Sequence, residues 1–333
     1  MDIQAEYDRL LAECETSAAP DPCITLSRQF SKDAIWKSYD WLLSLVPVSL
    51  SGQAAVDVGC KYGHVLPLFL IRGASRAIGV DVEDEYLEAG RRILGKLYPT
   101  LEFEKSDQGY LPIPPASVGF VMLNEVISHV NPMYLDNLYS EVARILKPGG
   151  YLLISDGNNI ANEECRRDLL NVYDAWENGP AGRHTGRDVV DPAFWESRRD
   201  LIRARYPQLP AEKVEYLARH TFGLFGAFFF ATVDEYVRSG RLVERPFRPG
   251  LCPTNPRASG VLIERGFHPQ QVELTLAGYG IRANQVLPAP PTGLRGIVHR
   301  LRGCIRQCLH AEAKSGADRG ASWAFQILGV KEF

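Results

Sequence analysis

The sequence contains no run of about 18 apolar residues, so nothing in it predicts a membrane-spanning helix. Its first residues, MDIQAEYDRL, lack the basic start and apolar stretch of a signal peptide. The seven cysteines include no Cys-x-x-Cys pair, which argues against a structural zinc site and a disulfide scaffold. These absences predict a cytoplasmic protein with reduced thiols and no metal.

Charge of one sign is also lacking. The 37 basic and 40 acidic residues give a formal net charge of −3, which provides no general attraction to nucleic acid. A hydrophobic fraction of 45% and a charged fraction of 23% are ordinary for a globular protein. At roughly 150 residues per domain, 333 residues predict two domains, or one large domain with insertions.

What the sequence does contain is an alternation of short apolar runs with helical patterns. Five such runs, each typical of a buried strand, occupy residues 54–58, 77–80, 101–104, 120–123 and 151–155. Helical patterns lie between them. Because strands that alternate with helices pair in parallel, the pattern predicts an α/β fold with a doubly wound, mostly parallel sheet.

The alternation stops after Asp156 and resumes near the end of the chain, where we expect a helix at 257–264 and strands at 272–277 and 324–331. We therefore predict one core with two insertions. The predicted parts are N-terminal helices in 1–50, a core of 51–156 and 253–333, a helical cap at 157–252, and a second insertion at 278–322. The second insertion carries a basic amphipathic pattern at 294–310. Docking on its own domain is our first interpretation of this helix, and the alternatives are contact with a membrane surface or a lipid-linked acceptor, and contact with a partner.

A glycine-containing turn is the first motif that indicates chemistry. In VDVGCKYG, residues 56–63, an acidic residue ends a predicted strand and glycines open the following helix. Asp81 ends the second strand 22 residues after Gly59, which is the spacing of an acid that holds ribose hydroxyls. The pair predicts a nucleoside-containing cofactor, with a plain strand–helix turn as the alternative.

Five strings in order extend this motif over residues 54–156: VDVGCKYG, GVD, SDQGYLPIPPAS, NEVISHV and LKPGGYLLISD. Together they resemble the class I S-adenosylmethionine-dependent methyltransferases of the small-molecule type. The resemblance implies a seven-stranded, Rossmann-like sheet whose last strand is antiparallel. It also implies S-adenosylmethionine as the cofactor.

The resemblance implies roles for individual residues. Asp57 would hold the amino group of the cofactor and Asp81 the ribose hydroxyls. Asp107 and Gln108 would face the adenine, and Asn124 would lie near the methionine part. The full set of predicted cofactor-binding residues is Asp57, Gly59, Cys60, Gly63, Asp81, Val82, Asp107, Gln108 and Asn124.

One position departs from the family pattern, because Lys61 stands where the middle glycine is usual. The turn tolerates a side chain there if the backbone of residue 61 is not left-handed. Two destinations remain open for the ammonium group. It points to solvent, or it reaches the cofactor carboxylate or an anionic substrate.

Methyl transfer requires a nucleophile held in line with the sulfonium methyl and shielded from water. If the nucleophile is a hydroxyl, a base removes its proton. The candidate catalytic residues are His129 and Asp156, and Glu125 is a further candidate base. For His129, local packing at the start of a helix is the alternative.

The cap follows directly from the reactive end of the fifth strand, so we expect it to cover the acceptor. It is rich in aromatic residues, which suit an apolar or ring-shaped acceptor or form the core of the cap itself. The predicted substrate-binding residues are Tyr173, His184, His220 and Phe222.

These features predict a methyltransferase that acts on a small-molecule or glycan acceptor, with oxygen as the preferred atom. The alternatives are an N-methyltransferase for a small amine, a nicotinamide-dependent oxidoreductase, and a binding protein that has lost the chemistry. The sequence predicts no nucleic-acid partner and leaves the oligomeric state open.

Overall fold

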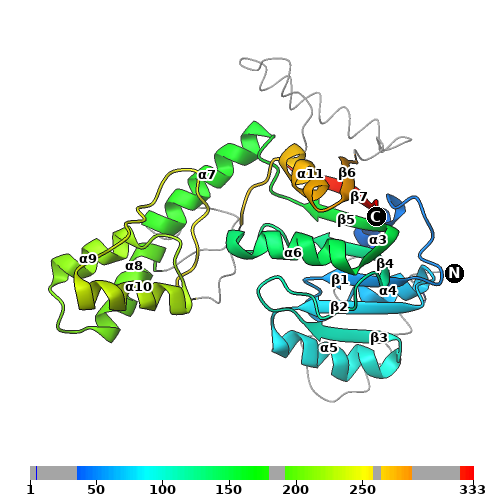
Figure 1. Cartoon of the computed structure of the whole chain (residues 1–333), viewed down its shortest axis with the longest axis horizontal. Helices are drawn as coiled ribbons and strands as arrows, with labels where there is room; N and C mark the ends of the chain where they lie inside the picture. The colour runs from blue at the N-terminus through cyan, green and yellow to red at the C-terminus, as the bar shows by residue number, and fades with distance from the viewer. Residues whose placement is uncertain (1–4, 6–35, 180–191, 258–263, 287–322) are drawn as a thin grey trace.

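A seven-stranded sheet forms the centre of the molecule. The computed structural model describes residue 5 and residues 36–179, 192–257, 264–286 and 323–333. The strands have the order β3-β2-β1-β4-β5-β7-β6 (Figure 1). Their bounds are β1 Ala54–Val58, β2 Arg76–Asp81, β3 Leu101–Lys105, β4 Val118–Asn124, β5 Leu146–Asp156, β6 Ile281–Gln285 and β7 Phe325–Lys331.

Strands β1 to β5 are parallel, and β7 runs antiparallel to both of its neighbours, β5 and β6. The predicted fold, a doubly wound and mostly parallel seven-stranded sheet, is therefore confirmed, as is its antiparallel last strand.

The sheet is buried because apolar layers cover both of its faces. All five residues of β1 are buried, which is the pattern of a central strand in a parallel sheet. Neighbouring residues belong to different layers, since successive side chains of a strand point to opposite faces. Ala55 packs with Phe69 and Phe120 on one face, whereas Val56 packs with Val121 and Ile154 on the other.

Five helices of the described residues pack against the sheet: α3 (Trp36–Ser44), α4 (Leu66–Ile71), α5 (Asp84–Leu97), α6 (Pro132–Ile145) and α11 (Pro269–Gly278). The start of α6 follows from its sequence. Asn131 accepts a hydrogen bond from the N–H of Met133, and Pro132 occupies the first helical position, where no N–H is needed. Helix α3 lies within 1–50, where helices were predicted, and most of that range is outside the described residues.

Among the described residues, the predicted helical insertion contains four helices: α7 (Glu163–Asn178), α8 (Phe194–Arg205), α9 (Ala211–His220) and α10 (Gly226–Ser239). They lie on the side of the sheet where the parallel strands end (Figure 1). Part of the aromatic content forms a core within this cap, because Phe229 is fully buried among Ile202, Leu217 and Val233. We call residues 157–252 the cap below.

The predicted strand at 272–277 is wrong, because these residues belong to helix α11. Apolar residues alternate there, which resembles a strand, but only Val272 and Leu276 are buried, and Leu274 is 69% exposed. A spacing of four residues is one helical turn. The strand follows instead as β6, inside the range that we assigned to the second insertion.

Two further predictions concern residues outside the described part of the chain. Most of the helix expected at 257–264 and all of the basic segment 294–310 fall there. In the described residues, no helix has the length and hydropathy needed to cross a bilayer. The cytoplasmic location stays a prediction.

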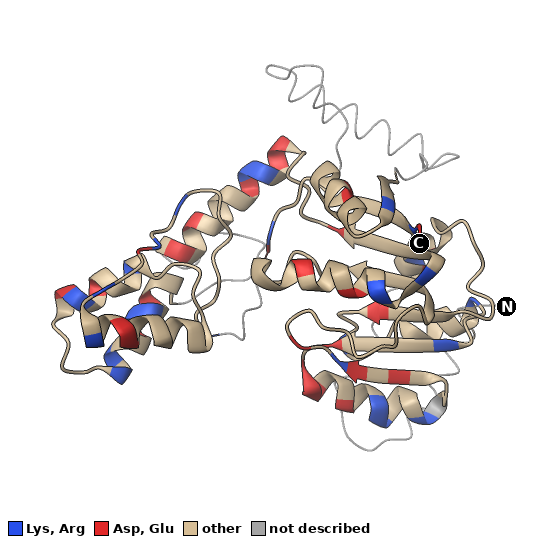
Figure 2. Cartoon of the chain, in the orientation of Figure 1, with Lys and Arg blue, Asp and Glu red and all other residues tan. Residues whose placement is uncertain are grey.

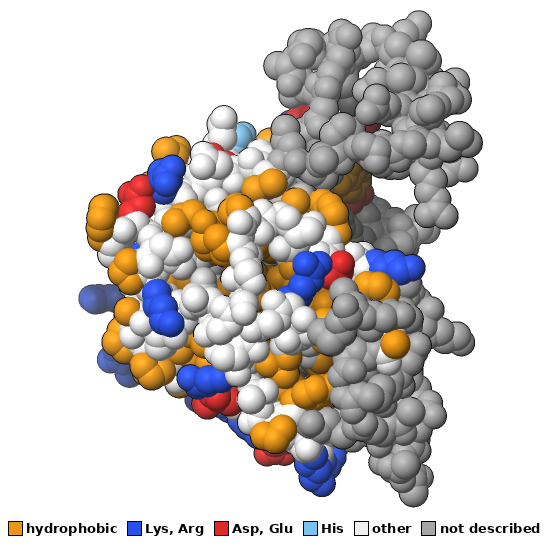
Figure 3. All heavy atoms as spheres, turned by 90° about the vertical axis from the view of Figure 1, so that its right-hand side faces the viewer, with side chains coloured by type: hydrophobic (Ala, Val, Ile, Leu, Met, Phe, Trp, Pro, Cys, Tyr) orange, Lys and Arg blue, Asp and Glu red, His pale blue; other side chains and the backbone are white. Residues whose placement is uncertain are grey.

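Charges of both signs are spread over the described surface. Acidic residues gather where β3 ends and α5 begins (Figure 2). On the face turned away from the cap, basic, acidic and apolar side chains are interspersed (Figure 3). The absence of a nucleic-acid partner remains a prediction from the net charge.

Candidate functional site

Four predicted cofactor residues meet at one edge of the sheet. Asp57 lies near the end of β1, Asp81 ends β2, Asn124 ends β4, and Asp107 follows β3 by two residues. Because β3, β2, β1 and β4 are neighbours in the sheet, their carboxyl ends form a continuous edge. Ligands of open α/β sheets bind at such an edge.

Asp81 organises the loops at this edge. One carboxylate oxygen, Oδ2, accepts a hydrogen bond from the N–H of Lys61 at 2.8 Å. The other, Oδ1, accepts from the N–H groups of Val82 at 2.8 Å and Glu83 at 3.1 Å. A carboxylate offers about four acceptor positions, so roughly one remains for a ligand hydroxyl.

The turn after β1 has three residues with positive φ: Gly59 (+73°), Lys61 (+52°) and Gly63 (+75°). The condition that we set for a side chain at residue 61 is therefore not met, since its backbone is left-handed. The bond to Asp81 and the bond from the N–H of Gly63 to the carbonyl of Cys60, at 2.8 Å, hold the turn in this conformation.

The two glycines are also required by packing. A Cβ on Gly59 would lie 2.6 Å from a methyl carbon of Val126, and one on Gly63 would lie 2.5 Å from the ring of Phe103. Real Cβ atoms do not approach other atoms so closely. Any side chain at these positions would displace the loop after β4 or the side chain from β3.

The ammonium group of Lys61 lies beside two aromatic rings. Its Nζ is 5.8 Å from the ring centre of Tyr62 and 5.6 Å from that of Tyr86. These are cation–π distances, worth about 0.5–1 kcal/mol at an exposed site. The sequence left two positions open for this ammonium group, in solvent or at the cofactor or substrate. In the structure the side chain is exposed and lies against α5.

Asp57 is a buried acid at the centre of the edge. It is 5% exposed, and burial, followed by the negative charge of Asp81, raises the pKa of its carboxyl to about 8. A buried carboxylate is stabilised by a positive group placed against it. The environment of Asp57 is therefore suited to a cationic ligand group.

Helix α3 reaches the same edge, which the sequence patterns did not indicate. The amide of Asn124 donates to the hydroxyl of Tyr39 at 3.3 Å. The ring of Tyr39 meets that of His64 edge-on, with 6.2 Å between centres. Burial, with the charge of Asp57, raises the pKa of Tyr39 to about 12, and burial lowers the pKa of His64 to about 4. Both side chains are uncharged near neutral pH.

The remaining predicted cofactor residues differ in exposure. Cys60 is buried, and its sulfur occupies the space beside Gly79, where a Cβ would come within 2.7 Å. Burial raises the pKa of this thiol. Val82 and Gln108 are exposed at the edge, and Gln108 has a positive φ of +50°.

Asp156, a predicted catalytic residue, is completely buried. Its carboxylate accepts hydrogen bonds from the N–H groups of Ser128 at 3.2 Å and Asn158 at 3.1 Å, and burial raises its pKa. It thereby ties the end of β5 to the loop after β4. This geometry favours a positioning role over proton transfer.

Glu125 and His129 lie in that same loop. Glu125 has a positive φ of +54°, and its Oε2 accepts a hydrogen bond from the N–H of Gly157 at 3.2 Å. Burial, followed by the charge of Asp156, raises the pKa of Glu125 to about 7, and the nearby His129 opposes this rise. A carboxyl that is carried on a strained backbone and titrates near neutral pH is a good candidate for a general base.

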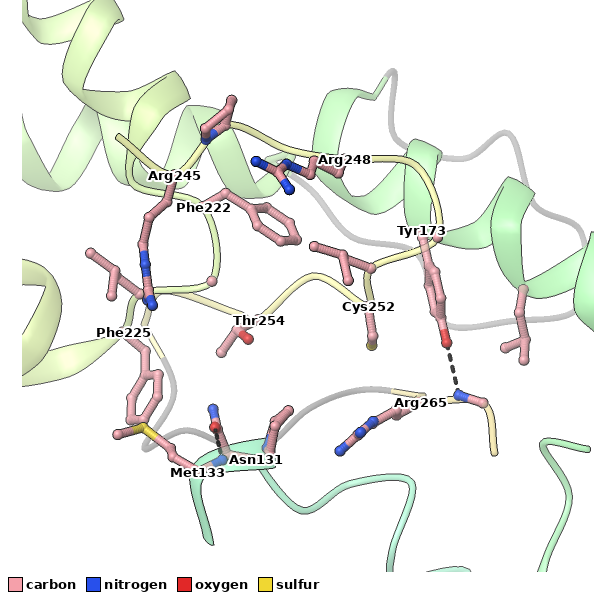
Figure 4. A pocket seen from close by; sticks show the side chains of 18 of the residues that line it. Asn131, Met133, Tyr173, Phe222, Phe225, Arg245, Arg248, Cys252, Thr254 and Arg265 are labelled. Carbon is pink, nitrogen blue, oxygen red and sulfur yellow. Dashed lines mark hydrogen bonds between the residues drawn. The ribbon is translucent and has the colours of Figure 1, made fainter. Parts of the chain in front are cut away.

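A cavity of about 990 Å³ lies between this loop and the cap (Figure 4). Two of the predicted substrate-binding residues, Tyr173 and Phe222, line this cavity. His220 is not among its lining residues, because its Nδ1 lies 2.7 Å from the carbonyl oxygen of Tyr216 and its ring stacks on that tyrosine. His184 lies outside the described residues. The lining also includes arginines that the sequence patterns did not indicate, among them Arg245, Arg248 and Arg265 (Figure 4).

Residues 55–150 match the family described as "Methyltransferase domain". This segment contains the edge from Asp57 to Asn124. Residues 55–150 of this chain are a methyltransferase domain of the class I, S-adenosylmethionine-dependent type.

Curated relatives of the methyltransferase core share about a third of its residues. A probable S-adenosylmethionine-dependent methyltransferase from Mycolicibacterium smegmatis is 32% identical over 123 residues, which are 37% of this chain and 45% of the relative. A fatty-acid O-methyltransferase from the same organism is 35% identical over 112 residues, 32% of this chain and 38% of the relative. The chain spans about half the length, or less, of the curated relatives named here.

A ubiquinone/menaquinone biosynthesis C-methyltransferase from Bartonella bacilliformis is 29% identical over 149 residues, 43% of this chain and 54% of the relative. Among solved structures, an S-adenosylmethionine-dependent methyltransferase from Mesorhizobium loti is 16% identical, with a TM-score of 0.46 over 88% of this chain and 97% of that one. The three curated relatives named here are methyltransferases, and none favours the nicotinamide-dependent alternative.

Proposed function

We propose that this chain transfers the methyl group of S-adenosylmethionine to an oxygen atom of a small-molecule acceptor bound in the cavity. One observation carries the proposal. The loop after β4 starts next to Asn124, the last residue of that strand at the cofactor edge, and leads to Asn131 and Met133 at the start of α6, which line the cavity. Cofactor and acceptor would thus lie on two sides of one short loop.

The residues at the edge fit this cofactor by their chemistry. S-adenosylmethionine presents an ammonium group, a ribose diol and an adenine amino group, all of which seek hydrogen-bond acceptors. The edge supplies carboxylates from Asp57, Asp81 and Asp107. Asp57 would pair with the ammonium group, Asp81 would use its remaining acceptor position for the ribose, and Asp107 would face the adenine. When bound, the cofactor supplies an already activated methyl group.

The protein's own residues would prepare the acceptor. A hydroxyl nucleophile loses its proton as the methyl is transferred, and a carboxylate oxygen of Glu125 would receive it. Asp156 would hold the loop through Ser128, so that Glu125 and His129 keep their places. The cap would exclude water from the reacting atoms. His129 remains the second candidate base.

Oxygen as the accepting atom is supported by Glu125, since a base near neutral pH suits a hydroxyl. The names of relatives include O- and C-methyltransferases, so similarity alone leaves the atom open. A small molecule or a glycan remains the proposed acceptor class.

The test begins with calorimetric titration of S-adenosylhomocysteine into the protein, followed by incubation with methyl-labelled cofactor and a panel of hydroxyl, carboxyl and amine acceptors. Methoxy or methyl-ester signals in the product spectrum would support the proposal. A product labelled only at nitrogen or carbon would refute the oxygen assignment, and a protein that fails to bind S-adenosylhomocysteine would refute the cofactor assignment.

A further inference from the structure

The cavity beneath the cap carries an excess of positive charge. Its lining includes Arg166, Arg245, Arg248 and Arg265, against one acidic residue, Glu244. Arg166 is neutralised by an ion pair with Glu163. The carboxylate of Glu244 accepts a hydrogen bond from the hydroxyl of Tyr216. The other three arginines outnumber the single remaining carboxylate of Glu244, so a ligand would meet a net positive charge.

Arg245, Arg248 and Arg265 form no ion pair with any residue in the described part of the chain. The Nη1 atom of Arg265 is buried and has no hydrogen-bond partner among those residues. Figure 4 shows the guanidinium groups of Arg248 and Arg265 extending into the cavity from opposite walls. A buried donor without a partner is costly unless a ligand satisfies it.

The backbone holds two of these arginines in place. The N–H of Arg265 donates to the carbonyl of Ser128 at 2.9 Å, and its guanidinium lies 4.8 Å from the ring centre of Phe267. The N–H of Arg245 donates to the carbonyl of His220, and its carbonyl accepts from the N–H of Phe222, both at 2.8 Å. Arg265 is therefore fixed to the loop of the proposed base, and Arg245 is fixed to the end of helix α9 within the cap.

Apolar side chains line the rest of the cavity. Tyr173, Phe222 and Phe225 are buried in its wall. Phe228, Leu251 and Met133 also line it, although about half of each side chain is exposed. Exposed large apolar side chains around a cavity indicate a surface that a ligand covers. At about 990 Å³, the space is at the upper end of the usual range for a small-molecule site.

We propose that the acceptor is an amphipathic anion, whose carboxylate or phosphate head is attracted by the charges of Arg245, Arg248 and Arg265 and whose apolar body packs on Phe222 and Phe225. The planar guanidinium matches the oxygens of either head group with paired hydrogen bonds. This inference rests on the proposed function, because it names the substrate class of the same site.

Binding of three probes with the same apolar chain tests the inference: octanoate, octyl phosphate and octanol, titrated calorimetrically into protein saturated with S-adenosylhomocysteine. We expect at least one anion to bind ten times more tightly than octanol or better. Whichever anion binds more tightly identifies the head group. Equal binding of all three probes would overturn the proposal.

Variants locate the effect. Arg248→Gln and Arg265→Gln should each weaken binding of the anion about tenfold and leave octanol unchanged. Arg203→Gln is the matched control, since Arg203 is an exposed arginine of α8 that does not line the cavity. If Arg265→Gln fails to fold, the exposed Arg248 carries the test alone. An equal loss in the control would overturn the assignment.

The titration of S-adenosylhomocysteine without any acceptor probe distinguishes a failure of the proposed function from a failure of this inference. A protein that binds no S-adenosylhomocysteine contradicts the proposed function. A protein that binds it, yet shows no preference for the anions, contradicts only the inferred substrate class.

Discussion

The carboxylate of Asp81 accepts a hydrogen bond from the backbone N–H of Lys61, with 2.8 Å between oxygen and nitrogen. This bond connects two loops of the cofactor edge. The same carboxylate holds the N–H groups of Val82 and Glu83. Lys61 is left-handed at φ +52°, a conformation that costs a side-chain-bearing residue about 1–2 kcal/mol. Asp81 therefore shapes the turn that would receive the cofactor, in addition to its proposed contact with the ribose.

Replacement of Asp81 should accordingly weaken cofactor binding in two ways. Asp81→Ala removes the ribose acceptor and releases Lys61, so affinity for S-adenosylhomocysteine should fall by at least about 1–3 kcal/mol. Calorimetry measures the loss. Asp84→Ala is the control, because Asp84 lies three residues away and pairs with Lys105 at the surface. Unchanged affinity in Asp81→Ala would remove this residue from the site.

The high pKa of Asp57 predicts that cofactor affinity depends on pH. With a pKa of about 8, its carboxyl is protonated in the free protein at pH 6 and ionised at pH 9. An ammonium group requires the ionised form, so affinity for S-adenosylhomocysteine should rise with pH up to about 8 and then level off. The rise can reach tenfold per pH unit.

Asp57→Asn should bind more weakly and lose this dependence, as calorimetry at several pH values would show. It should also alter stability. A carboxyl whose pKa is raised by folding destabilises the native state as pH increases through the window between 3.8 and about 8. The variant should therefore unfold at higher urea than the wild type at pH 8. If the wild type unfolded at higher urea than Asp57→Asn at pH 8, the buried charge assigned to Asp57 would be contradicted.

Glu125 should control the pH dependence of the reaction. A general base acts in its ionised form, so the rate should rise with pH through about 7, the pKa of Glu125. Glu125→Gln should lower the rate about 10²–10⁴-fold and flatten the profile, with cofactor affinity preserved. The assay uses the acceptor found in the panel. If His129→Gln has this effect and Glu125→Gln does not, the histidine is the base.

The cap depends on a buried ion pair between helices α7 and α8. Arg198 and Glu177 are both almost completely buried, and the Nε of Arg198 also donates to the carbonyl of Ala218 at 2.7 Å. Arg198→Met leaves a buried charge unpaired and should cost about 3–5 kcal/mol of unfolding free energy. Arg238→Met, which removes an exposed pair with Glu235, should cost less than about 1 kcal/mol.

Urea denaturation followed by tryptophan fluorescence measures both variants. Trp176 and Trp195 belong to the cap helices and report on this part of the molecule. Similar losses of unfolding free energy in the two variants would show that the buried pair stabilises the protein no more than the exposed pair.

The parts of the fold that follow from local pattern were predictable. Buried strands such as β1 and the glycine turn after it are encoded by neighbouring residues, so a short window identifies them. The stretch at 272–277 shows the limit of such a window. Its alternation of apolar residues resembles a strand, and only the burial of Val272 and Leu276 identifies a helix.

The cofactor edge was predictable because motifs mark it, whereas the cavity was not. Arg245 and Arg248 come from the cap after α10, and Arg265 comes from the segment before α11, and no spacing in the sequence relates them to Tyr173. Tyr39 was equally hidden, because its contact with Asn124 joins residues 85 positions apart. Contacts of this kind are created by tertiary packing.

The pairing of β5 with β7 has a consequence for how the chain folds. Asp156 lies opposite Phe325, so this ladder joins residues 169 positions apart, and the whole cap lies between them in sequence. Pairing over such a distance requires a large loop to close first, which slows folding. The five parallel strands β1–β5 can assemble from residues 54–156 before β7 is available. Until β7 arrives, β5 has an unpaired edge, where association between unfinished chains is favoured.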